Sequence, residues 1–455
     1  MTQPARLSRR VTVSYGMGAV GNGVFVTVPG LLLLYYLTNI LGVGAGLASA
    51  VLFVPKFWDA FANPLMGSIS DRSTSRFGKR RPFMLVGGIG TALAFVLLFS
   101  APSFHSELTS ALYVTGVFTV AMTLYAVFCV PWSAMPPEMT PDYHERTRIT
   151  SVRMVLLTVG ILVGGALAPT IAGADDNGLG GSRSTYALMS VVVGAILGVA
   201  FLTAWWGTRD AATTLPMTGP APTLRQQYQV VRANRPFVTL FLGYNLQAAA
   251  TAAMLTGAQY VATYVLGSAS KSTLLFVFLV APCAVMVPLW RRFSTTRGKL
   301  VGYELATAIF GITALTLLFC RSEPEVLIYL QMILLGTGYA GMQLFPYAIL
   351  PDLISENATT PEEVGRAGIF TGVWQGGETV AFAIGPALYG LILAVTSYTS
   401  YKAGDPVPVQ SSSALHGLVV GFSVLPALLT LASLPFLRRY RAVDDDLQAR
   451  VLEIA

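Results

Sequence analysis

The most informative stretch of this chain runs Lys56-Phe-Trp-Asp-Ala-Phe-Ala-Asn-Pro-Leu-Met-Gly-Ser-Ile-Ser-Asp-Arg-Ser-Thr-Ser-Arg-Phe-Gly-Lys-Arg-Arg-Pro82. Its first part belongs to a long apolar run, yet it carries Lys56, Asp59 and Asn63, whose spacing places them on one face of a helix. A charged side chain at the centre of a membrane helix costs about 2.5–3.5 kcal/mol on insertion scales, so an acid there predicts a functional site. The alternative is a self-neutralised Lys56–Asp59 pair kept only for packing.

The composition of the chain is that of a protein embedded in a lipid bilayer. Of its 455 residues, 54% are hydrophobic and 11% are charged. Apolar runs of about 20 residues or more recur along almost the whole chain and leave no room for a large soluble domain. The net charge of +7 lies mainly in short loops, so we expect contact with lipid and no nucleic-acid partner.

The apolar runs predict an all-α membrane protein with twelve transmembrane helices. Alternate loops are rich in Lys and Arg, and such loops mark the cytoplasmic side of a membrane protein. With an even number of spans, both termini are then expected in the cytoplasm. The expected spans are 12–40, 45–70, 82–101, 108–136, 147–172, 184–207, 235–266, 270–290, 298–320, 324–351, 364–397 and 414–437.

Short motifs of the first half recur in the second half in the same order. The pairs are Tyr35–Gly42 with Tyr260–Gly267, Ser75–Lys79 with Thr295–Lys299, and Pro131–Pro136 with Pro346–Pro351. This internal repeat predicts two pseudo-symmetric six-helix bundles, with a substrate site between them near the middle of the membrane. The expected domains are 1–207, a polar cytoplasmic linker at 208–234, and 235–455 with a short cytoplasmic tail.

Four charged residues lie deep inside expected spans: Lys56, Asp59, Arg153 and Glu378. Together with polar and aromatic neighbours, they suggest a hydrated cavity that binds a substrate. The alternatives are that Arg153 reaches the cytoplasmic boundary and that Glu378 is a helix-end group. The candidate substrate-binding residues are Lys56, Asn22, Tyr125, Trp132, Arg153, Trp374, Gln375 and Glu378.

Charged residues at the cytoplasmic ends of the spans suggest a gate. Basic side chains after the second and eighth spans can pair with loop acids and with helix C-termini, which would stabilise one conformation of a transporter. Orientation by positive charge alone is the alternative. Glu138 and Glu145 belong to the first of two matching gate clusters of acids and arginines. The candidate gating residues are Asp71, Arg76, Lys79, Arg80, Arg81, Glu145, Arg146, Arg297, Asp352 and Arg366.

With these motifs, the chain resembles the glycoside–pentoside–hexuronide:cation symporter family of the major facilitator superfamily. Familiar members are bacterial melibiose permease and the animal sodium-dependent lysophosphatidylcholine symporters. The resemblance covers essentially the whole chain, and the Trp-Asp-Ala motif with the basic loop behind it is fairly specific. The matching stretches are Ser14–Ala19, Trp58–Gly67, Arg76–Pro82, Pro131–Ser133, Glu145-Arg146 and Pro346–Asp352.

The resemblance implies roles for single residues. Asp59 matches the family's first cation-binding aspartate, and Asn63 replaces the second. Lys56 falls where melibiose permease has an arginine, and Arg153 matches a sugar-contacting arginine. The sequence departs from the sugar permease at the positions of its two sugar-binding carboxylates and of a lysine in the eleventh span, which are Gly23, Phe128 and Gln375 here.

We therefore expect a secondary active transporter that works by alternating access and couples a cation to a glycoside-like small molecule. The alternatives are a symporter or flippase for lysophospholipids or other amphiphiles, and an uncoupled facilitator. An enzyme is not expected, because the extracytoplasmic loops carry no cluster of acids or histidines. We expect a monomer in the plasma membrane, coupled to sodium or protons through Asp59 and Asn63, with no cofactor and no metal except sodium at Asp59.

Overall fold

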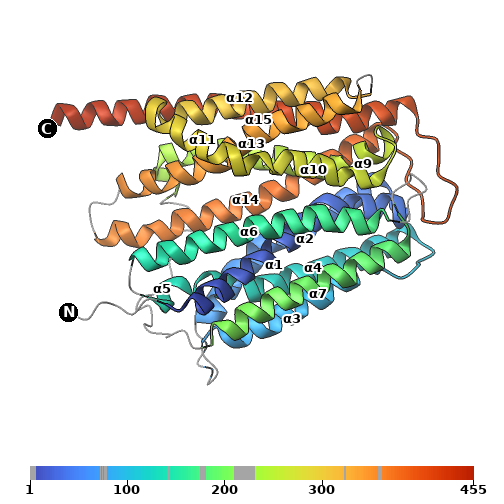
Figure 1. Cartoon of the computed structure of the whole chain (residues 1–455), viewed down its shortest axis with the longest axis horizontal. Coiled ribbons are helices and arrows are strands. Elements are labelled where there is room, and N and C mark those ends of the chain that lie inside the picture. Colours follow the sequence, from blue (N-terminus) through green and yellow to red (C-terminus); the bar gives the residue numbers. More distant parts are fainter. Residues whose placement is uncertain are drawn as a thin grey trace. The chain divides into compact units, whose positions relative to one another are not determined.

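The structure, a computed structural model, describes residues 7–71, 73, 75, 79–140, 143–174, 181–209, 231–321, 324–356 and 361–454. These residues are helical apart from loops and one isolated bridge between Leu41 and Lys402 (Figure 1). Among them, 12 helical segments are long and apolar enough to cross a membrane. The predicted twelve spans are therefore confirmed.

The helices of the first half are α1 (Arg9–Tyr35), α2 (Ala45–Asp71), α3 (Arg81–Phe99), α4 (Glu107–Ser133), α5 (Pro136–Met139), α6 (Tyr143–Ala172) and α7 (Arg183–Gly207). Those of the second half are α9 (Arg235–Tyr264), α10 (Ser272–Val280), α11 (Pro282–Arg297), α12 (Lys299–Thr316), α13 (Glu325–Glu356), α14 (Pro361–Val395) and α15 (Ser412–Ile454).

These helices form two compact units. The first unit contains α1 to α7 together with Gly267–Thr273 and Thr399–Val409. The second contains the rest of the described chain from α9 to α15. The expected domain boundaries at 207 and 235 stay a prediction, since residues 210–230 lie outside the described part.

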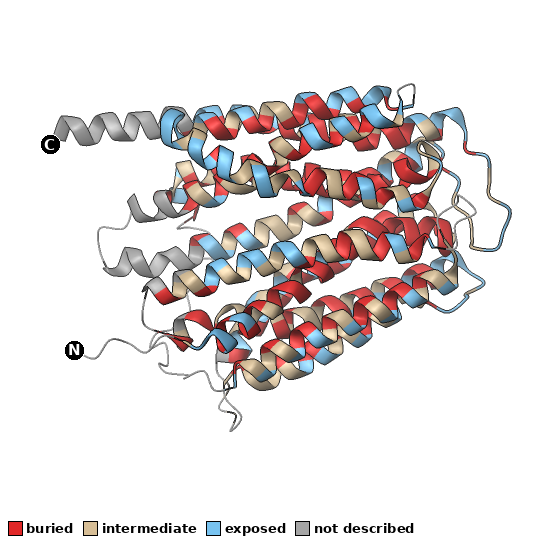
Figure 2. Cartoon of the chain, in the orientation of Figure 1, coloured by how far each residue is buried: buried red, intermediate tan, exposed pale blue. Residues whose placement is uncertain are grey.

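In the first unit, α1 is the most buried span, with 78% of its apolar window inside the structure (Figure 2). It packs against α6 and α7, while α4 packs against α2 and α3. Gly23 permits the close approach of α1 to α6, because a Cβ atom there would lie 2.6 Å from the Leu157 carbonyl oxygen. The backbones of the two helices therefore touch at this glycine, as small residues allow in membrane helices.

The second unit repeats this arrangement around α9. The α9 window is 67% buried, and the helix packs against α14 and α15. Gly385 of α14 takes the role of the small residue, because its Cβ would lie 2.7 Å from the Ala253 nitrogen of α9. The first and fifth spans of each unit thus make a close backbone contact, which agrees with the internal repeat in the sequence.

Three local features differ from the expected spans. The eighth span is divided at Ala281 into α10 and α11, because Pro282 has no N–H to continue the helical hydrogen bonds. The first span ends in a π-helical turn, Tyr36–Ile40. The last helix does not stop near residue 437 but continues to Ile454, so the expected tail is helical beyond the apolar segment that ends at Tyr440.

Candidate functional site

The helix α2 brings Lys56, Asp59 and Asn63 together as the spacing predicts. Lys56 and Asp59 are 7% and 4% exposed. Asn63 Nδ2 donates a hydrogen bond of 3.0 Å to Asp59 Oδ2, and the charge of Lys56 acts on Asp59. The other carboxylate oxygen, Asp59 Oδ1, is buried and accepts no hydrogen bond from the described residues. This arrangement leaves one acceptor atom available for a cation or a proton.

Side chains from α4 and α6 lie near this acid. The charges of Asp59 and of Arg153 both act on Tyr125 and on Cys129, so an acid of α2 and a base of α6 share one neighbourhood within the first unit. Tyr125 Oη donates to Asn22 Oδ1 of α1 at 2.5 Å. Three predicted substrate-binding residues, Asn22, Tyr125 and Arg153, are therefore neighbours of the predicted cation residue.

Trp132 is fully buried and holds Arg153 in place. Its ring stacks on Tyr15 with centroids 5.0 Å apart, and its Nε1 donates to the Tyr15 carbonyl oxygen at 3.0 Å. The guanidinium carbon of Arg153 lies 4.5 Å from the centre of the Trp132 ring, within the range of a cation–π contact. Trp132 thus contacts both Tyr15 and a base of the neighbouring helix, and its contact with a substrate stays a prediction.

The second unit contains its own charged cluster. Tyr347 Oη of α13 donates to both oxygens of Glu378 at 3.1 and 3.0 Å, and Tyr244 Oη of α9 donates to Glu378 Oε1. Trp374, on the same helix as Glu378, stacks on the Tyr244 ring at 4.6 Å. Gln375 is exposed and takes no part in this cluster.

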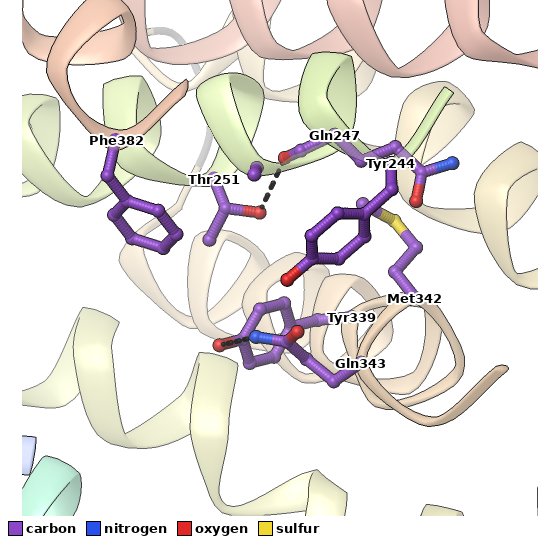
Figure 3. A pocket seen from close by; sticks show the side chains of 8 residues that line it. Tyr244, Gln247, Thr251, Tyr339, Met342, Gln343 and Phe382 are labelled. Carbon is purple, nitrogen blue, oxygen red and sulfur yellow. Dashed lines mark hydrogen bonds between the residues drawn. The ribbon is translucent and has the colours of Figure 1, made fainter. Parts of the chain in front are cut away.

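A small cavity lies next to this cluster, between α9, α13 and α14 (Figure 3). Its volume of about 10 Å³ is close to what a single water molecule needs. Gln343 Nε2 donates to Tyr339 Oη at 2.7 Å on one side of it. Its lining residues are Tyr244, Gln247, Ala248, Thr251, Tyr339, Met342, Gln343 and Phe382.

Two of the predicted gating arginines have well-defined partners. Arg80 is nearly buried and forms a two-bonded ion pair with Glu138, with Nε–Oε2 and Nη2–Oε1 distances of 2.8 and 2.6 Å. The guanidinium carbon of Arg81 lies 5.2 Å from the centre of the Trp205 ring of α7. Arg80 therefore connects the loop after α2 to α5, and Arg81 connects the start of α3 to α7.

The other predicted gating residues that the structure describes lie in α6, in the loop before α3 and at the end of α11. Glu145 pairs with Arg148 at 2.6 Å, and Arg146 Nε donates to the Thr140 carbonyl oxygen at 2.9 Å. Lys79 lies in the loop before α3, and Arg297 is the last residue of α11. Arg76 lies outside the described residues, as do the side chains of Asp71, Asp352 and Arg366.

Three residues of these clusters were not among the predicted site residues: Cys129, Tyr244 and Tyr347. Cys129 follows Tyr125 by one helical turn, but a lone cysteine in an apolar run carries no specific signal. Tyr347 had a signal, because the internal repeat pairs Pro131-Trp132 with Pro346-Tyr347. Among the described residues, no group of three or more His, Cys, Asp or Glu side chains could hold a metal ion.

Two positions explain how this chain departs from the sugar permease that it resembles. A side chain at Gly23 would meet the backbone of α6, and Phe128 is fully buried with its ring 4.1 Å from that of Phe201. Both positions are therefore used for helix packing. A carboxylate at Gly23 would require α6 to move, and one at Phe128 would be buried next to Phe201.

The chain belongs to the family described as "MFS/sugar transport protein", which matches residues 14–443. It is therefore a membrane transporter of the major facilitator superfamily and a multi-pass protein of the cell membrane. The resemblance noted from the motifs is confirmed.

Curated relatives support the same assignment over nearly the full length. The "Glucuronide carrier protein homolog" of Escherichia coli is 22% identical, with 99% of this chain and 96% of the relative covered. The "Sodium-dependent lysophosphatidylcholine symporter 1" of Mus musculus is 23% identical, with 95% and 86% covered. The crystal structure of a bacterial homolog of the human lysosomal transporter Spinster is 14% identical with a TM-score of 0.65 and 95% of each chain covered, which shows the shared fold.

Proposed function

We propose that this transporter is a cation-coupled symporter of a glycoside-like small molecule, that it works by alternating access, and that it is no enzyme. In this proposal, Asp59 and Asn63 bind the coupling cation. Lys56, Asn22, Tyr125 and Arg153 form the part of the substrate site that the first unit supplies. The names of the relatives, a glucuronide carrier homolog and a sodium-dependent symporter, support both the kind of substrate and the use of a cation.

The observation that carries the proposal is the unused oxygen of Asp59. A buried carboxylate oxygen without a hydrogen-bond donor is costly, and native structures leave few such groups without a function. Asp59 Oδ1 is such an atom among the described residues. Binding a sodium ion or a proton would supply its missing partner, with the Asn63 carbonyl as a second oxygen for sodium.

A second candidate substrate is a lysophospholipid or another amphiphile. Two positions favour it, Gly23 and Phe128. In the sugar permease that the chain resembles, these positions carry the carboxylates that hold sugar hydroxyls, whereas here both residues pack against neighbouring helices. Without those acceptors, the first unit offers fewer partners for a polyhydroxylated ring. The mouse lysophosphatidylcholine symporter among the relatives supports this alternative.

We further propose that the Arg80–Glu138 pair belongs to a cytoplasmic gate. Arg81, Lys79, Glu145, Arg146 and Arg297 would contribute to it. The roles of Asp71, Arg76, Asp352 and Arg366 in this gate rest on the sequence alone, as do the cytoplasmic location of the termini and the monomeric state.

A ligand-stabilisation screen tests the proposed function. The purified protein is heated with methyl glycosides, glucuronides or lysophosphatidylcholine, each in sodium chloride and in potassium chloride. A ligand that binds the folded state raises the melting temperature. Stabilisation by a glycoside that is larger in sodium, or at a more acidic pH, supports the proposal. Stabilisation by the lysolipid alone would favour the second candidate, and no stabilisation by any of them would contradict both.

A further inference from the structure

The carboxylate of Glu378 carries an unbalanced negative charge inside a membrane-spanning segment. Glu378 lies in the span Phe370–Val395, and the described residues provide no ion pair to it. The groups that act on it are the two tyrosines that donate hydrogen bonds, Tyr244 and Tyr347. Asp59 differs, because Lys56 lies one turn away on the same helix. An ionised acid at membrane depth without a cation is expensive, so Glu378 should bind a positive charge.

The hydrogen bonds around Glu378 suit two charge states. In the ionised state, the carboxylate accepts from both phenols, and the two phenol oxygens are 3.2 Å apart. A phenol is both a donor and an acceptor. A protonated Glu378 can therefore donate to Tyr347 Oη while it still accepts from Tyr244. All three groups stay hydrogen-bonded, and no heavy atom has to move.

The packing of the aromatic rings leaves little room for a larger cation. Tyr244 and Trp374 are 3% and 1% exposed and stack on one another, and the Tyr347 ring meets both edge-on. These packed rings occupy space beside the carboxylate that an organic ammonium group would need. A sodium ion would need several oxygen ligands, and the two phenols direct their protons at Glu378. A proton fits the hydrogen bonds that are already present.

We infer that Glu378, Tyr244 and Tyr347 form a proton-binding site in the second unit. The site is open at Tyr347, which is 41% exposed. Tyr244 also lines the small cavity, which has room for about one water molecule.

The surroundings of the site contain few other titratable groups. Glu378 sits on α14, which packs against α9, α13 and α15. The group facing it from α9 is Tyr244, and those from α13 are Tyr347 and, at longer range, Tyr339. No described group of α15 acts on it. The site is independent of the cation proposed at Asp59, so either proposal can fail without the other.

Infrared spectroscopy of the purified protein tests the inference without any transported substrate. A protonated carboxyl group absorbs at a frequency distinct from that of a carboxylate, so difference spectra between alkaline and acidic buffer report each acid that titrates. We expect a carboxyl band in the wild-type protein that Glu378→Gln removes and Asp59→Asn leaves in place. In Tyr244→Phe the carboxyl group loses a phenol that only donates to it, which costs the charged form more than the neutral form, and the Glu378 band should grow at a fixed pH.

The matched control is Glu325→Gln. Glu325 also accepts a hydrogen bond from a tyrosine, Tyr329, but it lies at the start of α13. This variant should leave the Glu378 band unchanged. Identical difference spectra of the wild type and a folded Glu378→Gln variant would overturn the inference. Loss of the band on addition of sodium chloride or tetramethylammonium chloride would overturn it too, because the site would then bind another cation.

Discussion

The guanidinium carbon of Arg153 lies 4.5 Å from the centre of the Trp132 ring. The internal repeat pairs Trp132 with Tyr347, which contacts Glu378 instead. In each unit, an aromatic residue near the end of the fourth span therefore meets a charged residue of the fifth span, and an aromatic residue of the first span stacks on the cluster. The repeat keeps the aromatic positions, but the charged residue is a base, Arg153, in the first unit and an acid, Glu378, in the second. Each unit thus surrounds a charged residue of its fifth span with aromatic side chains.

The variant Asp59→Asn should abolish cation-driven accumulation. Asparagine keeps one carbonyl oxygen but removes the negative charge that would attract a sodium ion or bind a proton. Exchange of labelled for unlabelled solute across proteoliposomes, without a gradient, should persist in part. The control is Asp405→Asn, which changes an exposed loop residue. Unchanged concentrative uptake by the Asp59 variant would rule out the coupling role.

The variant Asn63→Asp should strengthen the dependence of transport on sodium. Asn63 already donates to Asp59 Oδ2 at 3.0 Å, so a carboxylate here would place two negative charges together. Two such carboxylates attract a cation strongly. When no cation is bound, one of the two acids tends to be protonated. Uptake measured under separate sodium and proton gradients checks this. If the variant responds to sodium no more than the wild type does, Asn63 lies outside the cation site.

The Arg80–Glu138 pair should contribute more to stability and gating than the Arg148–Glu145 pair does. Arg80 and Glu138 are 8% and 16% exposed, whereas Arg148 is 41% exposed. Removing one partner of a buried pair costs up to about 3–5 kcal/mol, and an exposed pair is worth about 0.2–1 kcal/mol. A double-mutant cycle with Arg80→Gln and Glu138→Gln measures the coupling.

The same variants test the proposed gate. Transport rates should change while the equilibrium binding of the solute found by the stabilisation screen stays within a few-fold of the wild type. Adding Arg81→Gln and Arg297→Gln should extend the effect on the rate. A large loss of affinity in a correctly folded variant would show that these arginines belong to the substrate site.

The spans and the acid of α2 were predictable because their signals are local. Membrane thickness fixes the length of an apolar helix, and Lys56, Asp59 and Asn63 lie on the same helix. The break at Ala281 could have been foreseen from Pro282, but proline also occurs inside unbroken spans such as α2, which contains Pro55 and Pro64. The missing N–H of a proline is therefore no certain signal of a break in a membrane helix.

The contacts between helices could not be predicted in the same way. The contact of the buried Trp132 ring with Arg153 joins two helices, and the sequence does not show which side chain of a neighbouring helix a tryptophan will meet. Tyr244 and Tyr347 were overlooked because tyrosines in membrane spans are common and most only pack. Their convergence on Glu378 depends on the rotation of three helices about their axes, and the sequence periodicity specifies that rotation only roughly.

Two glycines of α1 provide a matched test of the packing of the first unit. A Cβ at Gly23 would lie 2.6 Å from the Leu157 carbonyl oxygen, whereas a Cβ at Gly30 would meet nothing within 4 Å. Gly30→Ala should leave stability unchanged or raise it by about 0.4–1 kcal/mol, because alanine restricts the unfolded chain. Gly23→Ala should cost about 1–3 kcal/mol through overpacking, and Gly23→Asp should cost more because it also buries a charge. Thermal unfolding of the purified variants in detergent measures the difference. A Gly23→Asp variant that is as stable as the wild type and gains binding of a methyl galactoside would contradict this prediction. It would show that α6 can move away from α1 and that position 23 can belong to a substrate site.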